Sequence, residues 1–232
     1  MSATRPRAGH TWPRTIILDL DGTLIDSAPD IAAAVNAVLA GYGIEIGAAT
    51  ARRFLGDGAR KLIERVLAAH DVSAGADEIE RYTDAFTASY QARPCQLSVV
   101  FEGAAQALAA WRADGVRLAV CTNKPQAIAD RVIAHLGLDR HIEVVIGAGV
   151  HPLKPDPAPL LACLDALGCD AGAALYVGDM AVDRQAGHAA GLPVLLAEFG
   201  YAGEPVAQLG ADGVLTQWAE AADAVAALRD MD

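Results

Sequence analysis

The residues of this chain that could do chemistry begin with two aspartates, Asp19 and Asp21, directly after a short apolar run. That run, 16–18, has the β-branched, continuously apolar character of a buried parallel strand. Because strand side chains alternate, both carboxylates are expected on the same side, and Gly22 lets the chain turn away. Such a pair can hold a divalent cation, or can divide into a nucleophile and a general acid or base. An ordinary Asp-Gly turn is the alternative for this stretch taken alone.

Polar residues also follow two later apolar runs that are predicted to be strands. Thr122 and Asn123 follow one of them, and Asp179 follows the other, after a glycine. The carboxyl ends of parallel strands share one edge of an open sheet, and ligands bind at that edge. We therefore expect these side chains to meet the two N-terminal aspartates in one pocket.

A lysine and a fifth carboxylate complete the candidate set. Lys154 stands between Pro152 and Pro155, which favour a stiff extended loop that fixes the direction of the lysine. Asp183 lies four residues after Asp179, on the first turn of a predicted helix, where the helix dipole favours a carboxylate in any case. Taken singly, a lysine is usually solvated and a threonine at a strand end is usually a turn former.

The elements that must position these residues alternate between strand and helix from residue 102 onward, which predicts a doubly wound parallel sheet. Between 27 and 94 the pattern shows helices and loops without a strand signal. The fold prediction is an α/β, Rossmann-like core (14–26 and 95–232), a small helical cap inserted after the first strand (27–94) and a flexible tail (1–13). The first predicted helix begins after Ser27 and ends at Gly41 and Gly43. The other predicted helices are 59–69, 77–90, 102–113, 127–136, 158–167, 182–190 and 218–228, and 206–209 is predicted as a helical turn. The predicted strands are 16–18, 118–121, 142–146, 175–177, 194–197 and 214–215.

Composition restricts the class of protein. The 232 residues are 53% apolar and carry a net charge of −11, which indicates a globular chain and argues against general binding to nucleic acid or to anionic membranes. No apolar run is long enough to span a membrane, and the N-terminal segment lacks the apolar stretch of a signal peptide. The cysteines, whose spacing fits neither a zinc site nor a redox motif, favour free thiols in a reducing, cytoplasmic compartment; they are Cys95, Cys121, Cys163 and Cys169.

The motifs together resemble those of a known family. The stretch DLDGTLIDS (19–27), then Thr122, Lys154 and GDMAVD (178–183) are similar, in the same order, to the four motifs of the haloacid dehalogenase superfamily, in its phosphatase branch. The resemblance covers nearly the whole chain from residue 15 onward. Asp21 distinguishes the phosphatase branch from the dehalogenase branch, because the dehalogenases lack this second aspartate. The resemblance therefore implies phosphoryl transfer.

The resemblance also implies a role for each motif residue. Asp19 would be the nucleophile that forms an aspartyl-phosphate intermediate. Asp21 would protonate the leaving oxygen and then deprotonate the hydrolytic water. Thr122 would donate a hydrogen bond to a phosphoryl oxygen, and Lys154 would offset the negative charge of nucleophile and phosphate.

A cation is part of the same expectation. The resemblance implies Mg²⁺ held by Asp19, the backbone carbonyl of Asp21 and Asp179, with waters completing the octahedron. Asp183 would hold Lys154 or a metal-bound water in position. The family often has a small hydroxyl residue after the metal-binding aspartate, where this chain has Met180. Either a hydrogen bond to a metal-bound water is lost or the position tolerates the change, and activity is expected to survive.

The predicted cap contains a candidate substrate loop. Gly56 and Gly58 flank a turn before a helix, where backbone amides can face an anion, although a plain inter-helix turn is equally compatible. This loop, CTNKP (121–125) and GLPVLLAEFGY (191–201) are similar to those of phosphoglycolate phosphatases. Arg60 and Lys61 are then candidates for the substrate carboxylate, with exposed helix charges as the slightly favoured alternative. The expected substrate-binding residues are Thr122, Asn123, Gly56, Gly58 and Arg60.

The resulting hypothesis is a cytoplasmic, Mg²⁺-dependent phosphomonoesterase that acts on a small phosphate ester, with 2-phosphoglycolate favoured, as a monomer or homodimer without nucleic-acid or membrane partners. The alternatives are a capped phosphatase for a sugar phosphate or pyrophosphate, and a phosphosugar mutase. An alternative of a different class is a protein that has the same fold and binds a phosphorylated metabolite but does not catalyse a reaction. The intact set of Asp19, Asp21, Lys154 and Asp179 argues against that last alternative.

Overall fold

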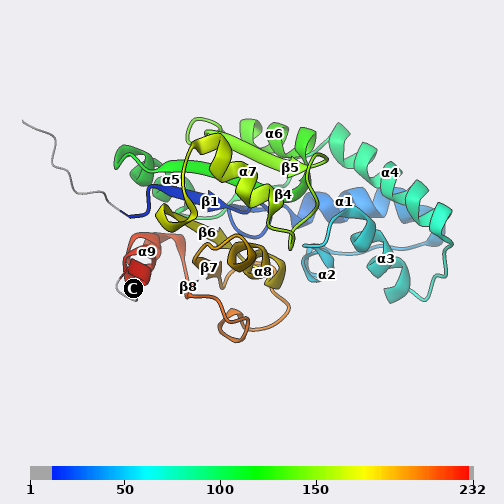
Figure 1. The fold of residues 1–232 in the computed structure, drawn as a ribbon. Coiled ribbons are helices and arrows are strands. Elements are labelled where there is room, and N and C mark those ends of the chain that lie inside the picture. The colour runs from blue at the N-terminus through cyan, green and yellow to red at the C-terminus, as the bar shows by residue number, and fades with distance from the viewer. Residues whose placement is uncertain (1–11, 230–232) are drawn as a thin grey trace, which may run out of the picture.

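The structure is a computed structural model that describes residues 12–229, so the predicted tail (1–13) lies almost entirely outside the described residues. Its centre is a six-stranded sheet of order β5-β4-β1-β6-β7-β8 in which all neighbouring strands pair in parallel (Figure 1). The first strand occupies a central position, which brings the ends of β4 and β6 beside its own end. The strands are β1 (Thr15–Leu18), β4 (Arg117–Pro125), β5 (Val144–Ala148), β6 (Ala174–Gly178), β7 (Val194–Ala197) and β8 (Gly213–Leu215).

Helices cover both faces of this sheet, which explains why β1 is apolar at consecutive positions. Ile16 and Leu18 belong to the apolar cluster on one face, and Ile17 belongs to the cluster on the other, as strand alternation requires. All three side chains are fully buried. The first face is covered by α5 (Ala104–Ala113), α6 (Gln126–His135) and α9 (Ala221–Arg229), and the second by α7 (Ala158–Leu167) and α8 (Ala181–Ala189).

A helical insert follows the first strand and lies together at one end of the molecule (Figure 1). It leaves the core after β2 (Ile25–Asp26) and returns through β3 (Val99–Val100), and these two short strands pair with each other in antiparallel fashion. The predicted fold class, a parallel α/β core with a helical cap, is confirmed. The treatment of 27–94 as a separate unit stays a prediction. The insert consists of α1 (Ala28–Leu39), α2 (Ala48–Phe54), α3 (Ala59–Ala69) and α4 (Ala76–Ala92).

Both connections between cap and core are tied to one buried side chain, Asp30 in the first turn of α1. Its carboxylate accepts hydrogen bonds from the backbone amides of Gln96, Leu97 and Ser98 and from the Ser98 hydroxyl. Ser27 occupies the predicted N-cap position but its side chain does not cap the helix; the hydroxyl donates to Asp21 instead. The first turn of α1 is therefore hydrogen-bonded to residues 96–98, where the chain returns from the cap to the core.

The structure contains elements that the sequence did not predict. Helix α2 has only seven residues and one buried side chain, Ala51, so it lacks the apolar stripe that marks longer helices. Strands β2 and β3 have two residues each and form only because the chain ends of the insert meet. Strand β4 continues past Cys121 to Pro125, which matters below. None of the helices in 12–229 has the length and apolar character needed to span a membrane.

Candidate active site

Three buried carboxylates meet at the carboxyl ends of β1 and β6 and are called the acid cluster below. They belong to Asp19, Asp179 and Asp183, and one oxygen of each lies within 4.8 Å of the others. Asp19 directly follows β1, Asp179 directly follows β6, and Asp183 stands on the first turn of α8. The central position of β1 in the sheet therefore brings together residues that are 160 positions apart in the chain, at the shared edge where parallel strands end.

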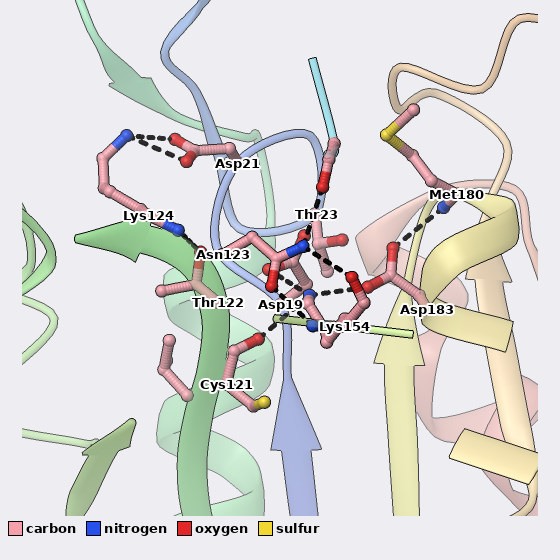
Figure 2. A network of polar contacts seen from close by, with 12 residues as sticks. Asp19, Asp21, Thr23, Cys121, Thr122, Asn123, Lys124, Lys154, Met180 and Asp183 are labelled. Carbon is pink, nitrogen blue, oxygen red and sulfur yellow. Dashed lines mark hydrogen bonds and ion pairs between the residues drawn. The ribbon is translucent and has the colours of Figure 1, made fainter. Parts of the chain in front are cut away.

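Lys154 is the cation of the acid cluster (Figure 2). Its Nζ lies 2.8 Å from Asp19 Oδ1 and donates to Asp183 Oδ1 at 2.6 Å and to the Cys121 carbonyl at 3.1 Å. It also donates to Tyr176 Oη at 2.8 Å. Burial alone would lower the pKa of Lys154, but the carboxylates of Asp183 and Asp19 outweigh burial and raise that pKa. Lys154 is thus a permanent positive charge beside the candidate nucleophile.

Both carboxylate oxygens of Asp183 accept hydrogen bonds from neighbouring residues of the core. Its Oδ1 accepts from Lys154 and from Tyr176, and its Oδ2 accepts the backbone amides of Asp179 and Met180 at 3.1 and 3.0 Å. These contacts use both carboxylate oxygens, so Asp183 fixes Lys154 and caps α8 at once. The arrangement fits the expected positioning role and also the helix N-terminal alternative, since one residue serves both.

Asp179 is packed tightly on all sides. Its Oδ1 accepts from the Thr23 hydroxyl at 3.0 Å and its Oδ2 accepts the Tyr201 amide at 2.7 Å. A Cβ on Gly22 would lie 2.3 Å from Asp179 Oδ2, and Gly22 has a φ of +88°, so this turn requires glycine for both space and conformation. The glycine of the first motif therefore makes room for the carboxylate of the fourth.

The acid cluster fits a metal cation. Three buried carboxylates lie together beside one ammonium, that of Lys154, which pairs with Asp19 and Asp183. This leaves uncompensated negative charge in a site where burial makes charge costly. Burial raises the pKa of Asp19 to about 7, although Lys154 opposes this shift, and burial together with Asp183 raises the pKa of Asp179 well above its usual range. Oxygen donors of this kind suit a hard divalent cation. The side chain of Asp21 is absent from this cluster, which leaves its backbone carbonyl as the expected ligand.

Asp21 turns toward a second lysine (Figure 2). Its carboxylate accepts from Lys124 Nζ with both oxygens, at 2.7 and 2.8 Å, and also from the Ser27 hydroxyl. Thr122 lies between the two lysine sites and accepts the backbone amide of Lys124 at 3.2 Å. The two aspartates of the first motif therefore have separate partners, as a nucleophile and an acid with different tasks require.

Asn123 joins the core to the cap loop. Its Nδ2 donates to the carbonyls of Gly56 and Lys154, at 2.9 and 3.0 Å, and its Oδ1 accepts the Lys154 amide at 2.8 Å. A Cβ on Gly56 would lie 2.6 Å from Met180 Sδ. Met180, which replaces the usual small hydroxyl residue, thus packs directly against the cap loop. Asn123 and Met180 both contact the cap loop at Gly56.

Most of these residues line a cavity that is partly open to solvent. Gly56 and Gly58 line it, as expected for a substrate loop. Arg60 is not among the lining residues; it pairs with Glu64 and its side chain is 49% exposed. The other lining residues include Asp19, Asp21, Thr122, Asn123, Lys124 and Lys154 from the core and Ile31, Leu55, Leu62, Phe86, Thr87 and Tyr90 from the cap.

Sequence reasoning missed three residues at this site: Lys124, Tyr176 and Tyr201. A signal for Lys124 existed, because it lies two positions after Thr122, and a strand that continues past Thr122 places both on one side. Tyr201 carries no such signal. Its amide binds Asp179, and its hydroxyl donates to Asp26 at 2.8 Å and accepts the Ser27 amide at 2.9 Å, which links the acid cluster to the start of the cap.

Comparison with protein families gives one match that covers most of the chain. The model of the family described as haloacid dehalogenase-like hydrolase matches residues 16–197. The matched segment begins in β1 and ends with β7, so it includes the acid cluster, Lys154 and the whole cap.

Individual proteins with known names are also similar. The phosphoglycolate phosphatase of Rhodospirillum rubrum is 41% identical over 217 residues, which is 91% of this chain and 90% of that protein. The plasmid-encoded phosphoglycolate phosphatase of Cupriavidus necator is 41% identical over 206 residues, 86% and 87% of the two chains. Among solved structures, a predicted phosphoglycolate phosphatase from Haemophilus somnus superposes with a TM-score of 0.84 at 29% identity, over 93% of this chain and 99% of that chain.

Proposed function

The chain belongs to the haloacid dehalogenase-like hydrolase family, and we propose that it is a Mg²⁺-dependent phosphomonoesterase that hydrolyses 2-phosphoglycolate to glycolate and phosphate. The observation that carries the reaction class is the position of Asp19. Its Oδ1 lies beside Lys154 Nζ but accepts no hydrogen bond of good geometry within 12–229, and Asp19 lines the cavity. The substrate rests on the relatives named phosphoglycolate phosphatase, which are about 40% identical over about 90% of the chain.

The proposed first step transfers the phosphoryl group to the protein. A carboxylate oxygen of Asp19 bonds to phosphorus while the ester P–O bond breaks, and Asp21 gives a proton to the departing oxygen. Lys154 and the Thr122 hydroxyl stabilise the charge on the phosphoryl oxygens. Asp21 is ion-paired with Lys124 in this structure, so Lys124 lies beside the group that must reach the ester oxygen.

The second step returns Asp19 to its starting state. Asp21, now ionised, takes a proton from a water molecule, whose oxygen bonds to phosphorus while the bond between phosphorus and the Asp19 oxygen breaks, and inorganic phosphate is released. Asp19, the backbone carbonyl of Asp21 and Asp179 would hold Mg²⁺, which offsets the negative charge of carboxylates and phosphate. Asp183 keeps Lys154 directed at the nucleophile through both steps. The apolar cap side chains exclude other water from the cavity.

The test is Mg²⁺-dependent phosphate release over a panel of 2-phosphoglycolate, sugar phosphates, pyrophosphate and an aryl phosphate. We expect 2-phosphoglycolate to give the highest kcat/KM, and Asp19→Asn to lower kcat by about 1,000-fold or more, because the nucleophile is lost. A different leading ester would leave the chemistry in place and reject the substrate. Turnover by Asp19→Asn at the wild-type rate would reject the mechanism.

The alternatives predict different products. A phosphosugar mutase returns the phosphoryl group to a bisphosphate intermediate and releases little net phosphate, so product analysis separates it from a phosphatase. A protein that only binds a phosphorylated metabolite would turn over no member of the panel. The contacts of Asp19 and Lys154 favour the enzyme over such a binding protein, because a binding site needs no cation fixed beside an unbonded carboxylate oxygen.

We also propose a cytoplasmic enzyme that is a monomer or a homodimer. All four cysteines are free thiols, and Cys95, Cys121 and Cys163 are buried, which suits a reducing compartment. Light scattering coupled to size-exclusion chromatography measures the oligomeric state directly.

A further inference from the structure

The cavity contains a second buried cation that the proposed chemistry leaves without a task. Among the described residues, the cavity wall carries two lysines, Lys154 and Lys124. Lys154 is fully engaged by the nucleophile, by Asp183, by a phenol and by a carbonyl. Lys124 is equally buried, with its side chain 2% exposed, yet it takes no part in the transfer of the phosphoryl group.

The surroundings of Lys124 are sparse for a buried ammonium. Two of its three N–H groups are accounted for by Asp21, at 2.7 and 2.8 Å. On the cap side it lies 4.7 Å from the centre of the Tyr90 ring, a cation–π contact. Burial alone would lower the pKa of Lys124, but Asp21 outweighs burial and raises it. The ammonium also lies near the Tyr90 hydroxyl, and its third N–H is available to a partner that both groups share.

A second feature lies at the same place. The Tyr90 hydroxyl on α4 is buried and has no hydrogen-bond partner of good geometry within 12–229, although it lies near the Lys124 ammonium, which opposes the rise that burial causes in the pKa of Tyr90. Tyr90 is only 3% exposed. A buried hydroxyl without a partner costs about 1–3 kcal/mol, so natural proteins seldom keep one without a reason. Tyr90 lines the cavity together with Lys124. An ammonium and an unsatisfied hydroxyl at one place suit a small anion.

The position of Asp21 places such an anion relative to the scissile bond. As the general acid, Asp21 must reach the ester oxygen of the substrate. Lys124 Nζ lies within one hydrogen bond of the same carboxylate. In 2-phosphoglycolate the carboxylate carbon is two bonds from the ester oxygen, so a substrate in contact with Asp21 brings its carboxylate within reach of Lys124.

We propose that Lys124 and the Tyr90 hydroxyl form the subsite for the substrate carboxylate and select esters that carry an anion two bonds from the ester oxygen. The proposal rests on the proposed function. The cap wall around the subsite is largely apolar, with Ile31, Leu62 and Phe86 among the lining residues. Such a wall strengthens a charge–charge contact and has few groups to bind the hydroxyls of a sugar.

The experiment compares two substrates that differ only in this group: 2-phosphoglycolate and 2-hydroxyethyl phosphate. The readout is the ratio of their kcat/KM values. We expect the wild-type protein to prefer 2-phosphoglycolate, and Lys124→Met to lower activity on both esters but to reduce the ratio by about 100-fold, mainly through KM, because a buried charged contact is lost. Tyr90→Phe is expected to reduce the ratio by about fivefold.

Two further variants serve as controls. Lys61→Met removes the chain's remaining lysine, which is 58% exposed and paired with Glu64 on the cap, and it should leave the ratio unchanged. Lys124→Arg keeps the charge and should retain most of the preference. Circular dichroism and thermal unfolding check that each variant folds; should Lys124→Met fail to fold, Tyr90→Phe and Lys124→Arg carry the comparison.

The outcomes separate the two proposals. If the wild-type protein hydrolyses esters without preferring 2-phosphoglycolate, the proposed function fails before any variant is compared. If the wild-type protein prefers 2-phosphoglycolate and Lys124→Met lowers kcat/KM equally for both substrates, Lys124 acts only by positioning Asp21. The carboxylate subsite is then rejected. A ratio that falls in Lys61→Met instead would move the subsite to the exposed face of α3.

Discussion

The two lysine sites of the cavity differ in where their partners come from. Lys154 is held by Asp19, Asp183, Tyr176 and a backbone carbonyl, all within the core. Lys124 is held by a core carboxylate on one side and by a ring from the cap on the other. The contacts of Lys154 are therefore complete within the core, whereas the contacts of Lys124 include a side chain of the helical insert.

This difference indicates that the Lys154 site serves the reaction and that the Lys124 site serves ligand recognition. A reaction centre built within one rigid sheet keeps its geometry whether or not the cap moves, and fixed geometry is what electrostatic stabilisation requires. A site shared between cap and core senses whether the right ligand is present, because only then are both halves satisfied. The predictions below test this comparison, beginning with the largest expected effect.

Removing the charge of the core site should affect all substrates alike. Lys154→Met is expected to lower kcat by about 1,000-fold or more for both 2-phosphoglycolate and 2-hydroxyethyl phosphate. It should also lower the free energy of unfolding by about 3–5 kcal/mol, because Asp19 and Asp183 lose their buried counter-ion. Phosphate release and urea unfolding measure the two effects, with Lys61→Met as the control. A change in substrate preference without loss of kcat would contradict the assignment of Lys154 to the chemical step.

Asp19, the proposed nucleophile, should make the metal-free protein less stable as pH rises. Its pKa is raised to about 7 in the folded state, against about 3.9 for an unperturbed aspartate, so the folded state binds the extra proton between these values. The free energy of unfolding of the wild-type protein relative to Asp19→Asn should therefore fall by up to about 4 kcal/mol from pH 4 to pH 7.5. Urea unfolding of both proteins in a chelator measures the difference.

Bound Mg²⁺ should oppose this loss of stability at higher pH if it binds the acid cluster. Added Mg²⁺ is expected to stabilise the wild-type protein at pH 7.5 more than at pH 5, because the carboxylates must be ionised to bind it. The same addition should have a smaller effect on Asp19→Asn, which has lost one charged ligand. Equal stabilisation of both proteins at both pH values would show that the cation binds elsewhere.

The contact between cap loop and core should be sensitive to a single methyl group. A Cβ on Gly56 would lie 2.6 Å from Met180 Sδ, and Gly56 has a φ of +110°. Gly56→Ala is therefore expected to lower kcat/KM about tenfold while the core remains folded. Gly75→Ala is the matched control, because Gly75 is also in the cap but has an ordinary φ of −74° and open space around it. Wild-type kinetics for Gly56→Ala would show that this loop does not set the position of the cap.

The smallest effect is expected at Arg60. Its side chain is half exposed, pairs with Glu64 and does not line the cavity. Arg60→Met should change kcat/KM for 2-phosphoglycolate by less than about twofold, since exposed ion pairs contribute little. A tenfold rise in KM would restore Arg60 as the carboxylate-binding cation and weaken the case for Lys124.

Much of the core could be predicted because its local patterns agree with its packing. Helices 59–69 and 158–167 and strand 194–197 have the predicted bounds, since each has a strong apolar pattern between clear breaks. Helix α2 could not be predicted in this way, because seven residues with one buried side chain leave no periodic signal. The pair β2–β3 depends on two segments more than 70 residues apart, which no local pattern records.

The sequence by itself determined the chemical inventory: the paired aspartates, the lysine between prolines and the carboxylates after a glycine, each at the end of a strand or in a stiff loop. The alternation of strands and helices, which predicts a parallel sheet, could place these residues at one edge because parallel strands end together. Only the tertiary structure decided how the charges are divided, with Asp19 facing Lys154 and Asp21 facing Lys124. Partner choice depends on which side chains packing brings within a few ångströms, and for Lys124 one of those partners, Tyr90, comes from the cap.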